Sequence, residues 1–356
     1  MESRFQTGEC SVSIYERVSV KKKGAYKMQE KRELRVAVLG AGIIAGSHLE
    51  AISATPGVTA CAVADLDQAK VGELAERWGI KGFTDYREML RNELPDIAVI
   101  ALPHFLHKEA SLAAIAHGAH LMLEKPMALS TAECDEIISA AEQAGIRVLV
   151  GHTQHYIAEN IEARRWVRSG ELGPLVMIQD NRHLSYFRDT RPSWFLDKAL
   201  SGGGILANLG THSIDKIQWL SDSAVSYVSA STSRHADRGN VEGSGMIYMR
   251  LQSGVSATIV QSGYPGEVRD ETELIFAGGM LKLATGRSLW VSRGGPYEPL
   301  EVPQTATPFE RQYAELAAAI RDGRETDCPP AYARGIIGVL EAVYRSAETG
   351  REQEVL

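Results

Sequence analysis

Three groups of residues have the types and spacing needed for chemistry, and the first is a glycine-rich turn. An apolar run at residues 34–39 is followed at once by Gly40-Ala41-Gly42-Ile43-Ile44-Ala45. Gly40 permits a tight turn, Gly42 lets the backbone approach a pyrophosphate, and Ala45 keeps the next helix close to the strand. The N-terminus of that helix offers N–H donors to phosphate. The turn therefore predicts a dinucleotide-binding site.

Asp65 indicates which dinucleotide would bind. It follows a second apolar run, residues 58–64. A carboxylate at this place can accept hydrogen bonds from both adenine-ribose hydroxyls and would repel a 2′-phosphate. The sequence thus favours NAD over NADP as the cofactor. The alternative is that the glycines only make a turn and that Asp65 caps a helix.

The second group is Glu124-Lys125-Pro126, which comes directly after a short apolar run at residues 121–123. In an open parallel sheet, the carboxyl ends of the strands face the ligand crevice. We therefore expect Lys125 to direct its ammonium toward the nicotinamide end of the cofactor, with Glu124 beside it. Outside such a sheet, this tripeptide would be an ordinary surface loop.

The third group is a segment that begins with Gly202-Gly203-Gly204 and contains Asn208 and His212. Three glycines indicate a backbone that a ligand or another strand approaches closely. Asn208 and His212 are four residues apart, so they share a face on a helical turn. Because histidine is a natural proton acceptor near neutral pH, His212 is the predicted general base. A purely structural histidine is the alternative.

Other polar and aromatic residues could line a substrate pocket. They are His152, His155, Tyr156, Arg182, His183, Tyr186, Trp194 and Lys198. Rings that stack on apolar sugar faces and side chains that bond hydroxyls suit a carbohydrate, although Tyr156 and Trp194 suit a core or an interface equally well. His104 and His107 have no third ligand at fitting spacing, so no metal site is predicted.

The elements that must position these groups follow two patterns. Up to residue 150, continuous apolar strands alternate with helical segments, which is typical of a parallel sheet covered on both faces. From residue 151, hairpin signals at Ser253-Gly254 and Gly278-Gly279 indicate antiparallel strands. The predicted fold is α/β, with a doubly wound parallel domain at 34–150 and an α+β domain at 151–356.

Residues 1–33 show no clear periodicity and end in a basic, polar stretch from Lys21 to Arg32. We expect a loosely ordered leader there. A narrower hypothesis places the natural start at Met28, because Lys22-Lys23-Gly24 can be encoded by a purine run resembling a bacterial ribosome-binding site.

The overall composition argues against several classes of partner. A chain of 356 residues with 44% hydrophobic residues can bury a core in each of two domains. A net charge of −7 argues against a nucleic acid or an anionic membrane as partner. The four cysteines are scattered, which suits a reducing compartment, and the sequence has neither the apolar run of a signal peptide nor that of a membrane span. The cytoplasm is the expected location.

Together, these motifs resemble those of the Gfo/Idh/MocA family, the glucose–fructose oxidoreductase and inositol dehydrogenase group. The resemblance extends from about residue 34 to near the C-terminus, and it includes the glycine turn, Ala101-Leu102-Pro103 with His107, Glu124-Lys125-Pro126, and the block that ends at Asp215. It implies a Rossmann domain followed by an open, largely antiparallel sheet, often used for contacts in a homodimer or homotetramer. It also implies a sugar or polyol-like substrate bound between the domains.

The resemblance implies roles for individual residues as well. Lys125 and His212 match the pair that acts on the reacting hydroxyl, and Asn208 joins them. The implied cofactor contacts are Gly40, Gly42, Ile43, Ile44, Ala45, Asp65, Pro103, His104, His107, Glu124 and Lys125. The candidate substrate contacts are His155, Tyr156, His183, Trp194, Lys198, Asn208 and His212.

Two positions depart from the family pattern. The family commonly has aspartate where this chain has Asn208, and an amide can position a hydroxyl but cannot exchange a proton at neutral pH. His104 stands where the family often has asparagine or a small polar residue beside the cofactor.

The sequence thus predicts an enzyme, an NAD(P)-dependent dehydrogenase or reductase that moves a hydride between a nicotinamide cofactor and a CH–OH carbon. Two alternatives keep the same fold. One is a non-catalytic regulator that senses the dinucleotide, and the other is a glycosidase that oxidises and re-reduces its sugar without net NAD turnover. Retention of Lys125 and His212 favours the enzyme, and NADH formation from a panel of sugars separates the three.

Overall fold

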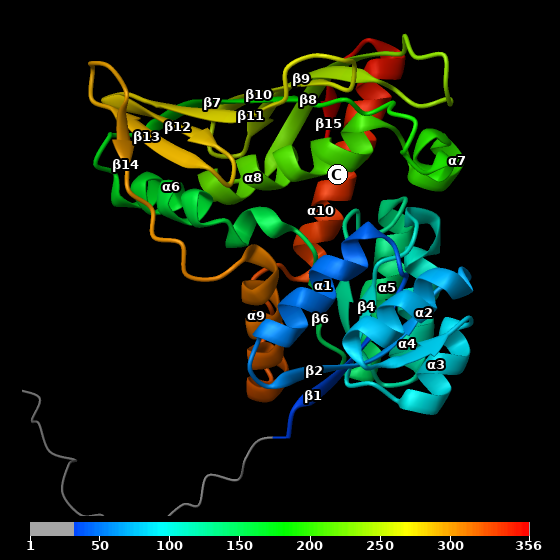
Figure 1. Cartoon of the computed structure of the whole chain (residues 1–356). Helices are drawn as coiled ribbons and strands as arrows, with labels where there is room; N and C mark the ends of the chain where they lie inside the picture. The colour runs from blue at the N-terminus through cyan, green and yellow to red at the C-terminus, as the bar shows by residue number, and fades with distance from the viewer. Residues whose placement is uncertain (1–31, 356) are drawn as a thin grey trace, which may run out of the picture. The chain divides into compact units, whose positions relative to one another are not determined.

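The structure is a computed structural model in which residues 32–355 are described. The predicted leader therefore lies outside the described residues except for its last two positions, and Met28 lies outside them too. Within residues 32–355, two β-sheets and their helices follow each other along the chain (Figure 1).

The first sheet confirms the predicted parallel architecture. Its strands are in the order β3-β2-β1-β4-β5-β6, and each neighbouring pair is parallel. The strands are β1 (Leu34–Leu39), β2 (Val58–Ala64), β3 (Lys81–Phe83), β4 (Ile97–Ile100), β5 (His120–Leu123) and β6 (Val148–Val150). Sequence analysis missed β3, because this strand has only three residues and two of them are exposed.

Helices cover both faces of this sheet. They are α1 (Ile43–Ala54), α2 (Gln68–Trp78), α3 (Tyr86–Glu93), α4 (His107–Ala116) and α5 (Thr131–Ala144). Alternate residues of β1 belong to different cores, since Ala37 and Leu39 pack into one cluster while Val36 and Val38 pack into the other. A strand buried on both sides must be apolar at every position, which explains the continuous apolar runs.

The second sheet has nine strands among the described residues, in the order β14-β13-β12-β11-β7-β10-β9-β8-β15. All neighbours are antiparallel except β7 and β10, which are parallel. The strands are β7 (Leu175–His183), β8 (Val225–Ser233), β9 (Ser244–Leu251), β10 (Ser256–Ser262), β11 (Arg269–Phe276), β12 (Gly279–Ala284), β13 (Ser288–Ser292), β14 (Glu298–Leu300) and β15 (Gln353–Glu354). The two predicted hairpins, β9–β10 and β11–β12, are confirmed.

Three of the helices after residue 150 contact strands of the second sheet, namely α6 (Ala158–Ser169), α8 (Thr211–Ser221) and α10 (Pro330–Thr349). The other two are α7 (Lys198–Ser201) and α9 (Pro308–Asp322). In Figure 1, α6 and α8 lie beneath the strands, and residues of both helices share one apolar core with the sheet. The strands therefore alternate between buried and more exposed residues, as in β9.

Helix α9 packs on the first half of the chain although it comes late in the sequence. It contacts α1 and β6, and Tyr313, Leu316 and Ala317 belong to the same core cluster as Val36. Helix α10 contacts both α5 and β8. Helix α10 also contacts β6, so it joins the first sheet to the second.

Candidate functional site

The two glycines of the turn between β1 and α1 differ in whether the fold itself requires glycine. Gly40 has φ +108°, and a Cβ there would lie 2.3 Å from the backbone oxygen of Ala101, so the fold itself requires glycine. A Cβ on Gly42 would have no atom within 4 Å, so nothing in the protein requires glycine there. Gly42 is the N-cap of α1, without a side-chain cap and without an acidic residue in the first turn. The helix N-terminus is open, as a phosphate site requires.

Asp65 is fixed beside this turn. Its Oδ2 accepts a hydrogen bond from the backbone N–H of Ala41 at 2.7 Å, and its Oδ1 accepts one from the N–H of Asp67 at 3.0 Å. The cap of α2 is Asp67, which accepts from Ala69 and Lys70. The alternative that Asp65 caps this helix is therefore wrong.

Two apolar side chains beside the turn are almost fully exposed. Ile43 is 91% exposed and Leu66 is 90% exposed, the highest values among the large hydrophobic residues of the described chain. Ile43 begins α1, and Leu66 follows Asp65. Apolar surface at both ends of an open phosphate site fits a dinucleotide, because its rings would cover these side chains.

Lys125 lies at the carboxyl end of β5 and reaches the second half of the chain. Its Nζ donates to Oδ1 of Asn208 at 3.0 Å and to the backbone oxygen of Asn208 at 3.0 Å. Burial lowers the pKa of Lys125 to about 8, with Glu124 acting against this shift and Arg182 and Arg191 adding to it. The predicted closeness of Lys125 and Asn208 is thus present in the structure.

Glu124 is held by residues far away in the sequence. Its Oε2 accepts from the backbone N–H of Lys125 at 3.2 Å, and its Oε1 lies 3.1 Å from Nε2 of His48. Nδ1 of His48 lies 2.8 Å from the hydroxyl of Tyr313 on α9. Burial raises the pKa of Glu124, but the hydrogen bond from His48 and the charges of its neighbours, Lys125 among them, together outweigh burial, so the pKa is lowered. Sequence reasoning missed His48 and Tyr313, because no local motif marks either.

The glycines before Asn208 make room for protein atoms. A Cβ on Gly203 would lie 1.9 Å from the hydroxyl oxygen of Tyr344, and one on Gly204 would lie 2.0 Å from the backbone oxygen of Glu242. The carboxylate of Glu242 accepts from the backbone N–H groups of Gly204 and Leu206, at 2.8 and 3.0 Å. Of the two expected reasons for these glycines, the structure shows close approach of the protein itself.

Asn208 and His212 are positioned by a wide helical turn that leads into α8. Residues Leu206–Gly210 form a π-helical turn, in which the N–H of Thr211 bonds the oxygen of Leu206 five residues earlier. Such turns are frequent at functional sites. Asn208 lies on the turn and His212 is the second residue of α8. Both side chains are half-buried.

His212 is held in its neutral form. Burial lowers the pKa of His212 well below its usual value, and the positive charges of Lys125 and Arg182 act in the same direction. Its Nδ1 is buried and has no hydrogen-bond partner among the described residues. Nε2 is not among the buried, unpaired atoms of the described residues.

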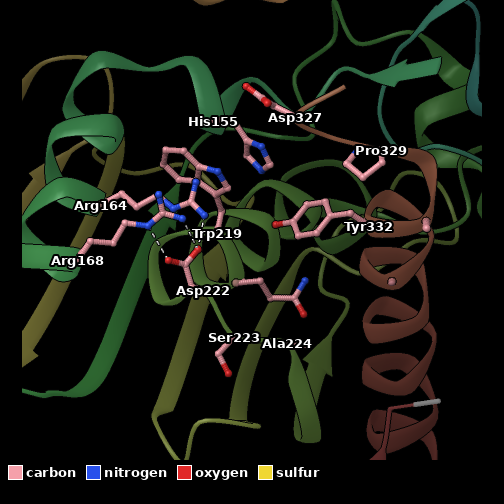
Figure 2. A pocket seen from close by; sticks show the side chains of 13 residues that line it. His155, Arg164, Arg168, Trp219, Asp222, Ser223, Ala224, Asp327, Pro329 and Tyr332 are labelled. Atoms are coloured by element: carbon pink, nitrogen blue, oxygen red, sulfur yellow. Dashed lines mark hydrogen bonds and ion pairs between the residues drawn. The ribbon is translucent and has the colours of Figure 1, made fainter. Parts of the chain in front are cut away.

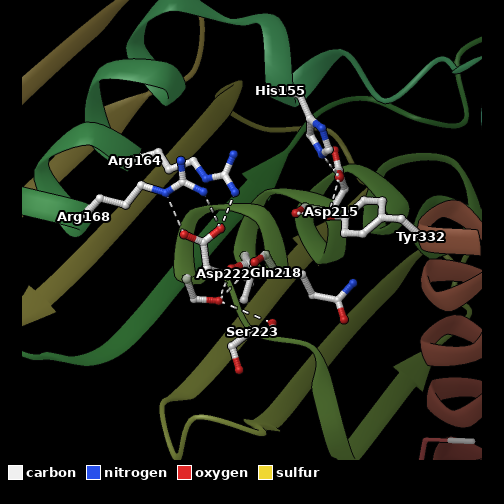
Figure 3. Close-up of polar contacts among 10 residues, drawn as sticks. His155, Arg164, Arg168, Asp215, Gln218, Asp222, Ser223 and Tyr332 are labelled. Carbon is white, nitrogen blue, oxygen red and sulfur yellow. Dashed lines mark hydrogen bonds and ion pairs between the residues drawn. The ribbon is translucent and has the colours of Figure 1, made fainter. Parts of the chain in front are cut away.

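His155 contacts α8 at Asp215 and Trp219, which follow His212 by three and seven residues and so lie on the same side of the helix. Its Nε2 is 2.7 Å from Oδ1 of Asp215, which also accepts from the hydroxyl of Tyr332 at 2.9 Å (Figure 3). The ring of His155 stacks on Trp219, with centroids 4.9 Å apart. Nδ1 of His152 lies 3.7 Å from Oδ2 of Asp215. This buried cluster anchors α8, the helix that carries His212.

A cavity of about 750 Å³ opens beside this cluster, between α6, α8 and the start of α10 (Figure 2). Its lining residues include His155, Trp219 and Tyr332, together with Arg164 and Asp222, which form an ion pair. Neither Lys125 nor His212 lines it. The volume of this cavity would suit a ligand, but the predicted reactive side chains do not line it.

The loop after β4 contributes Pro103, His104 and His107. His107 is fully buried, and its two ring nitrogens lie 2.8 Å from the backbone oxygen of Pro126 and 2.9 Å from that of Leu102. His107 thus ties the loop after β4 to the loop after β5. His104 is buried as well, with Nδ1 at 2.9 Å from the backbone oxygen of Ser201. Both histidines support the site from below its surface.

Three predicted pocket residues are placed apart from Lys125. His183 is on the face of β7 opposite to that of Asp180, whose side chain contacts Lys216 on α8. Lys198 is exposed and lies over the ring of Tyr344, 5.6 Å from its centroid. Tyr156 is buried in a core cluster of the first sheet. Trp194, in contrast, packs edge-on against His104 at 4.8 Å between centroids.

In residues 32–355, no group of three or more His, Cys, Asp or Glu side chains is arranged to hold a metal ion. No helix there is both long and apolar enough to cross a membrane.

The structure combines a parallel sheet with an open glycine turn, an acid held in place after β2, and a lysine that contacts the second half of the chain. These features define the class of NAD(P)-dependent oxidoreductases with a Rossmann domain. Comparison with known proteins agrees. Residues 34–152 match the oxidoreductase family with an NAD-binding Rossmann fold, and residues 161–282 match the GFO/IDH/MocA C-terminal domain. The chain belongs to the Gfo/Idh/MocA family of oxidoreductases, as its motifs predicted.

Relatives extend over nearly the whole chain. Inositol 2-dehydrogenase of Streptomyces avermitilis is 29% identical over 339 residues, which cover 90% of this chain and 94% of that protein. The crystal structure of aldose-aldose oxidoreductase from Caulobacter crescentus, complexed with glycerol, has a TM-score of 0.85 and 28% identity, covering 91% of this chain and 100% of that one. The structure of GenD2 from gentamicin A biosynthesis, in complex with NAD, has a TM-score of 0.82 and 26% identity, covering 95% and 100%.

Proposed function

We propose that this oxidoreductase acts on a hydroxyl group of a sugar, polyol or related compound, and that residues 34–150 hold the cofactor while residues 151–356 complete the substrate site. The observation that carries the proposal is the contact of Lys125 Nζ with Asn208 Oδ1 at 3.0 Å. It brings the lysine at the edge of the first sheet to the turn that presents His212. The named sugar and polyol relatives support the choice of substrate class.

Each side chain has a distinct role in this mechanism. The bound nicotinamide supplies the acceptor for the hydride that leaves the substrate carbon. His212 accepts the hydroxyl proton at Nε2, since its neutral form is favoured and Nδ1 is buried. The ammonium of Lys125 stabilises the developing negative charge on the substrate oxygen. Asn208 orients the hydroxyl by hydrogen bonding and exchanges no proton.

The cofactor of this proposal is NAD rather than NADP. Asp65 supports it, because its carboxylate is held in place by two backbone N–H groups and would repel a 2′-phosphate. The remaining cofactor contacts fall on Gly42, Ile43 and Ile44 at the start of α1, and on the loops that follow β4 and β5.

Cellular setting and assembly follow from the same resemblance. We infer a cytoplasmic enzyme that acts as a homodimer or homotetramer. Sedimentation of the purified chain measures the assembly directly, and a monomer at micromolar concentration would contradict this inference.

Replacement of the two central groups tests the mechanism. Lys125→Ala and His212→Ala should each lower kcat by about a hundredfold or more, the usual scale for acid–base and electrostatic groups. The measurement is NADH formation with a panel of sugars and polyols. Asp327→Asn is a matched control, because Asp327 is exposed in the cavity beside α10, which neither Lys125 nor His212 lines. Near-normal turnover in both alanine variants would contradict the assignment.

A further inference from the structure

A column of rings leads from the edge of the first sheet to Arg191. His104 packs against Trp194, and Trp194 stacks on Phe195 with centroids 3.8 Å apart. The guanidinium of Arg191 lies 4.9 Å from the centroid of Phe195 and 4.0 Å from that of Tyr186. Because Tyr186 is fully buried, the guanidinium has a rigid support. Arg191 is therefore held in one place at the junction of the two sheets.

Arg191 has no acidic partner to balance its charge. Among the ion pairs of residues 32–355, none includes Arg191. Its Nε donates to the backbone oxygen of Tyr186. Among the described residues, neither Nη has a hydrogen-bond partner and neither is a buried unpaired atom, so both remain available to a ligand. A guanidinium that is half-buried, fixed and unpaired suits the binding of a carboxylate or phosphate.

Arg182 adds a second cation close to His212. It lies on the same face of β7 as Asp180, which contacts α8. Gln261 is in register with Arg182 on the neighbouring strand and donates to Ser213, the residue after His212, at 2.8 Å. Arg182 is therefore next to the first turn of α8. Its Nη1 is buried and has no hydrogen-bond partner among the described residues.

Two acids lie close to Arg182 and to the buried Lys216. Asp180 pairs with the buried Lys216 at 2.8 Å. Asp270 pairs with Arg182 at 3.2 Å, but it is also 3.4 Å from Lys216. The charges of Arg182 and Arg191 both act on Lys125, whose pKa they lower. Asp180 and Asp270 match the charges of Lys216 and Arg182. Arg191 is the cation left without an acidic partner among the described residues, and a neutral polyol would leave its charge uncompensated.

We propose that the substrate carries an anionic group, a carboxylate or a phosphate monoester, which the unpaired Nη groups of Arg191 bind beside Arg182 while its hydroxyl meets Lys125 and His212. This inference rests on the proposed function and narrows its substrate class. Arg191 then determines specificity through two parallel N–H···O bonds, and Arg182 supplies attraction over the first turn of α8.

Three pyranoses that differ only at C6 test this proposal in the full-length protein with saturating NAD. They are glucose, glucuronate and glucose 6-phosphate. We expect kcat/KM for at least one anion to exceed that for glucose by about tenfold or more, the scale of a charge-assisted hydrogen bond. Glucuronate and glucose 6-phosphate distinguish a carboxylate from a phosphate. Arg191→Gln should reduce the anion-to-glucose ratio to near one, and Arg191→Lys should restore part of it.

Arg188→Gln is the matched control, because it removes the same charge from an exposed position of the same loop. It should leave the ratio unchanged. Equal use of glucose and both anions by the wild type, or the same ratio in both glutamine variants, would overturn the inference. A binding readout keeps it separate from the proposed function: at least one of the two anions should raise the Tm of the NAD-loaded wild type but not that of Arg191→Gln. If no sugar yields NADH, the proposed function fails, and the Tm shifts alone decide on the anion.

Discussion

At the scale of single residues, Lys125 is a reactive group whose pKa the structure moves into the range of enzyme assays. Burial favours its neutral form, Glu124 favours the charged form, and the result is a pKa of about 8. An ammonium with this pKa is still mostly charged at neutral pH but loses its proton within the range where enzymes are assayed. The role of Lys125 is therefore accessible to a pH titration.

The pH dependence of kcat/KM for oxidation should show one descending limb. Lys125 is charged below its pKa, so activity that depends on its ammonium is present below pH 8 and is lost as the pH rises through about 8. His212 remains neutral through the same range because its pKa is lowered. Lys125→Met should remove the limb along with most of the activity. Activity that rises from pH 7 to pH 9 would instead identify Lys125 as the base.

Asp65 gives a second prediction at this scale. Asp65→Ser removes a charge that repels a 2′-phosphate and an acceptor for the ribose hydroxyls. The ratio of kcat/KM with NAD to that with NADP should fall by about tenfold or more. Asp67→Asn is the control, because it removes a charge two residues away and can still cap α2. An unchanged ratio in Asp65→Ser would rule out this basis for cofactor choice.

At the scale of elements, the turn before α8 shows how packing sets a site. Gly203 and Gly204 let Tyr344 and Glu242 approach, and the Glu242 carboxylate then fixes the backbone that leads into the π-helical turn. These contacts therefore position Asn208 and His212. The sequence predicted the close approach, but not which partner makes it.

Gly204→Ala should destabilise this element. Its Cβ would lie 2.0 Å from a backbone oxygen, and a backbone atom cannot rotate away as a side chain can. Overpacking of this kind should lower the free energy of unfolding by about 1–3 kcal/mol, which urea denaturation measures. Gly72→Ala in α2 is the control, since its Cβ would have no atom within 4 Å. This substitution should increase the free energy of unfolding by about 0.5–1 kcal/mol. Equal stability of Gly204→Ala and the wild type would show that the turn tolerates a shift.

The same scale separates what local patterns predict from what they miss. Continuous apolar runs predicted the parallel strands, because a strand covered on both faces has to be apolar throughout. They missed β3, whose Lys81 and Gly82 are exposed. The period of four between Asn208 and His212 predicted a shared helical face, but the π-helical turn depends on contacts with Glu242 that lie outside any local window.

At the scale of the whole molecule, the contacts that the sequence motifs did not predict are those between residues far apart along the chain. Glu124 depends on His48 and, through it, on Tyr313 of α9. Asp215 is held between His155 and Tyr332. Each of these residues is ordinary in its own segment, so single-sequence motifs could name the reactive groups but not the neighbours that fix their orientation and charge.

The contact of Lys125 with Asn208 has a consequence for how the enzyme meets its substrate. In the proposed mechanism, the substrate oxygen shares the ammonium of Lys125 with Asn208, because an ammonium has three N–H donors and two of them already meet oxygens of Asn208. Lys125 is then largely satisfied before a substrate arrives, so a resting alcohol gains little from it. An alkoxide-like transition state is a stronger acceptor than the alcohol, so it gains more from Lys125.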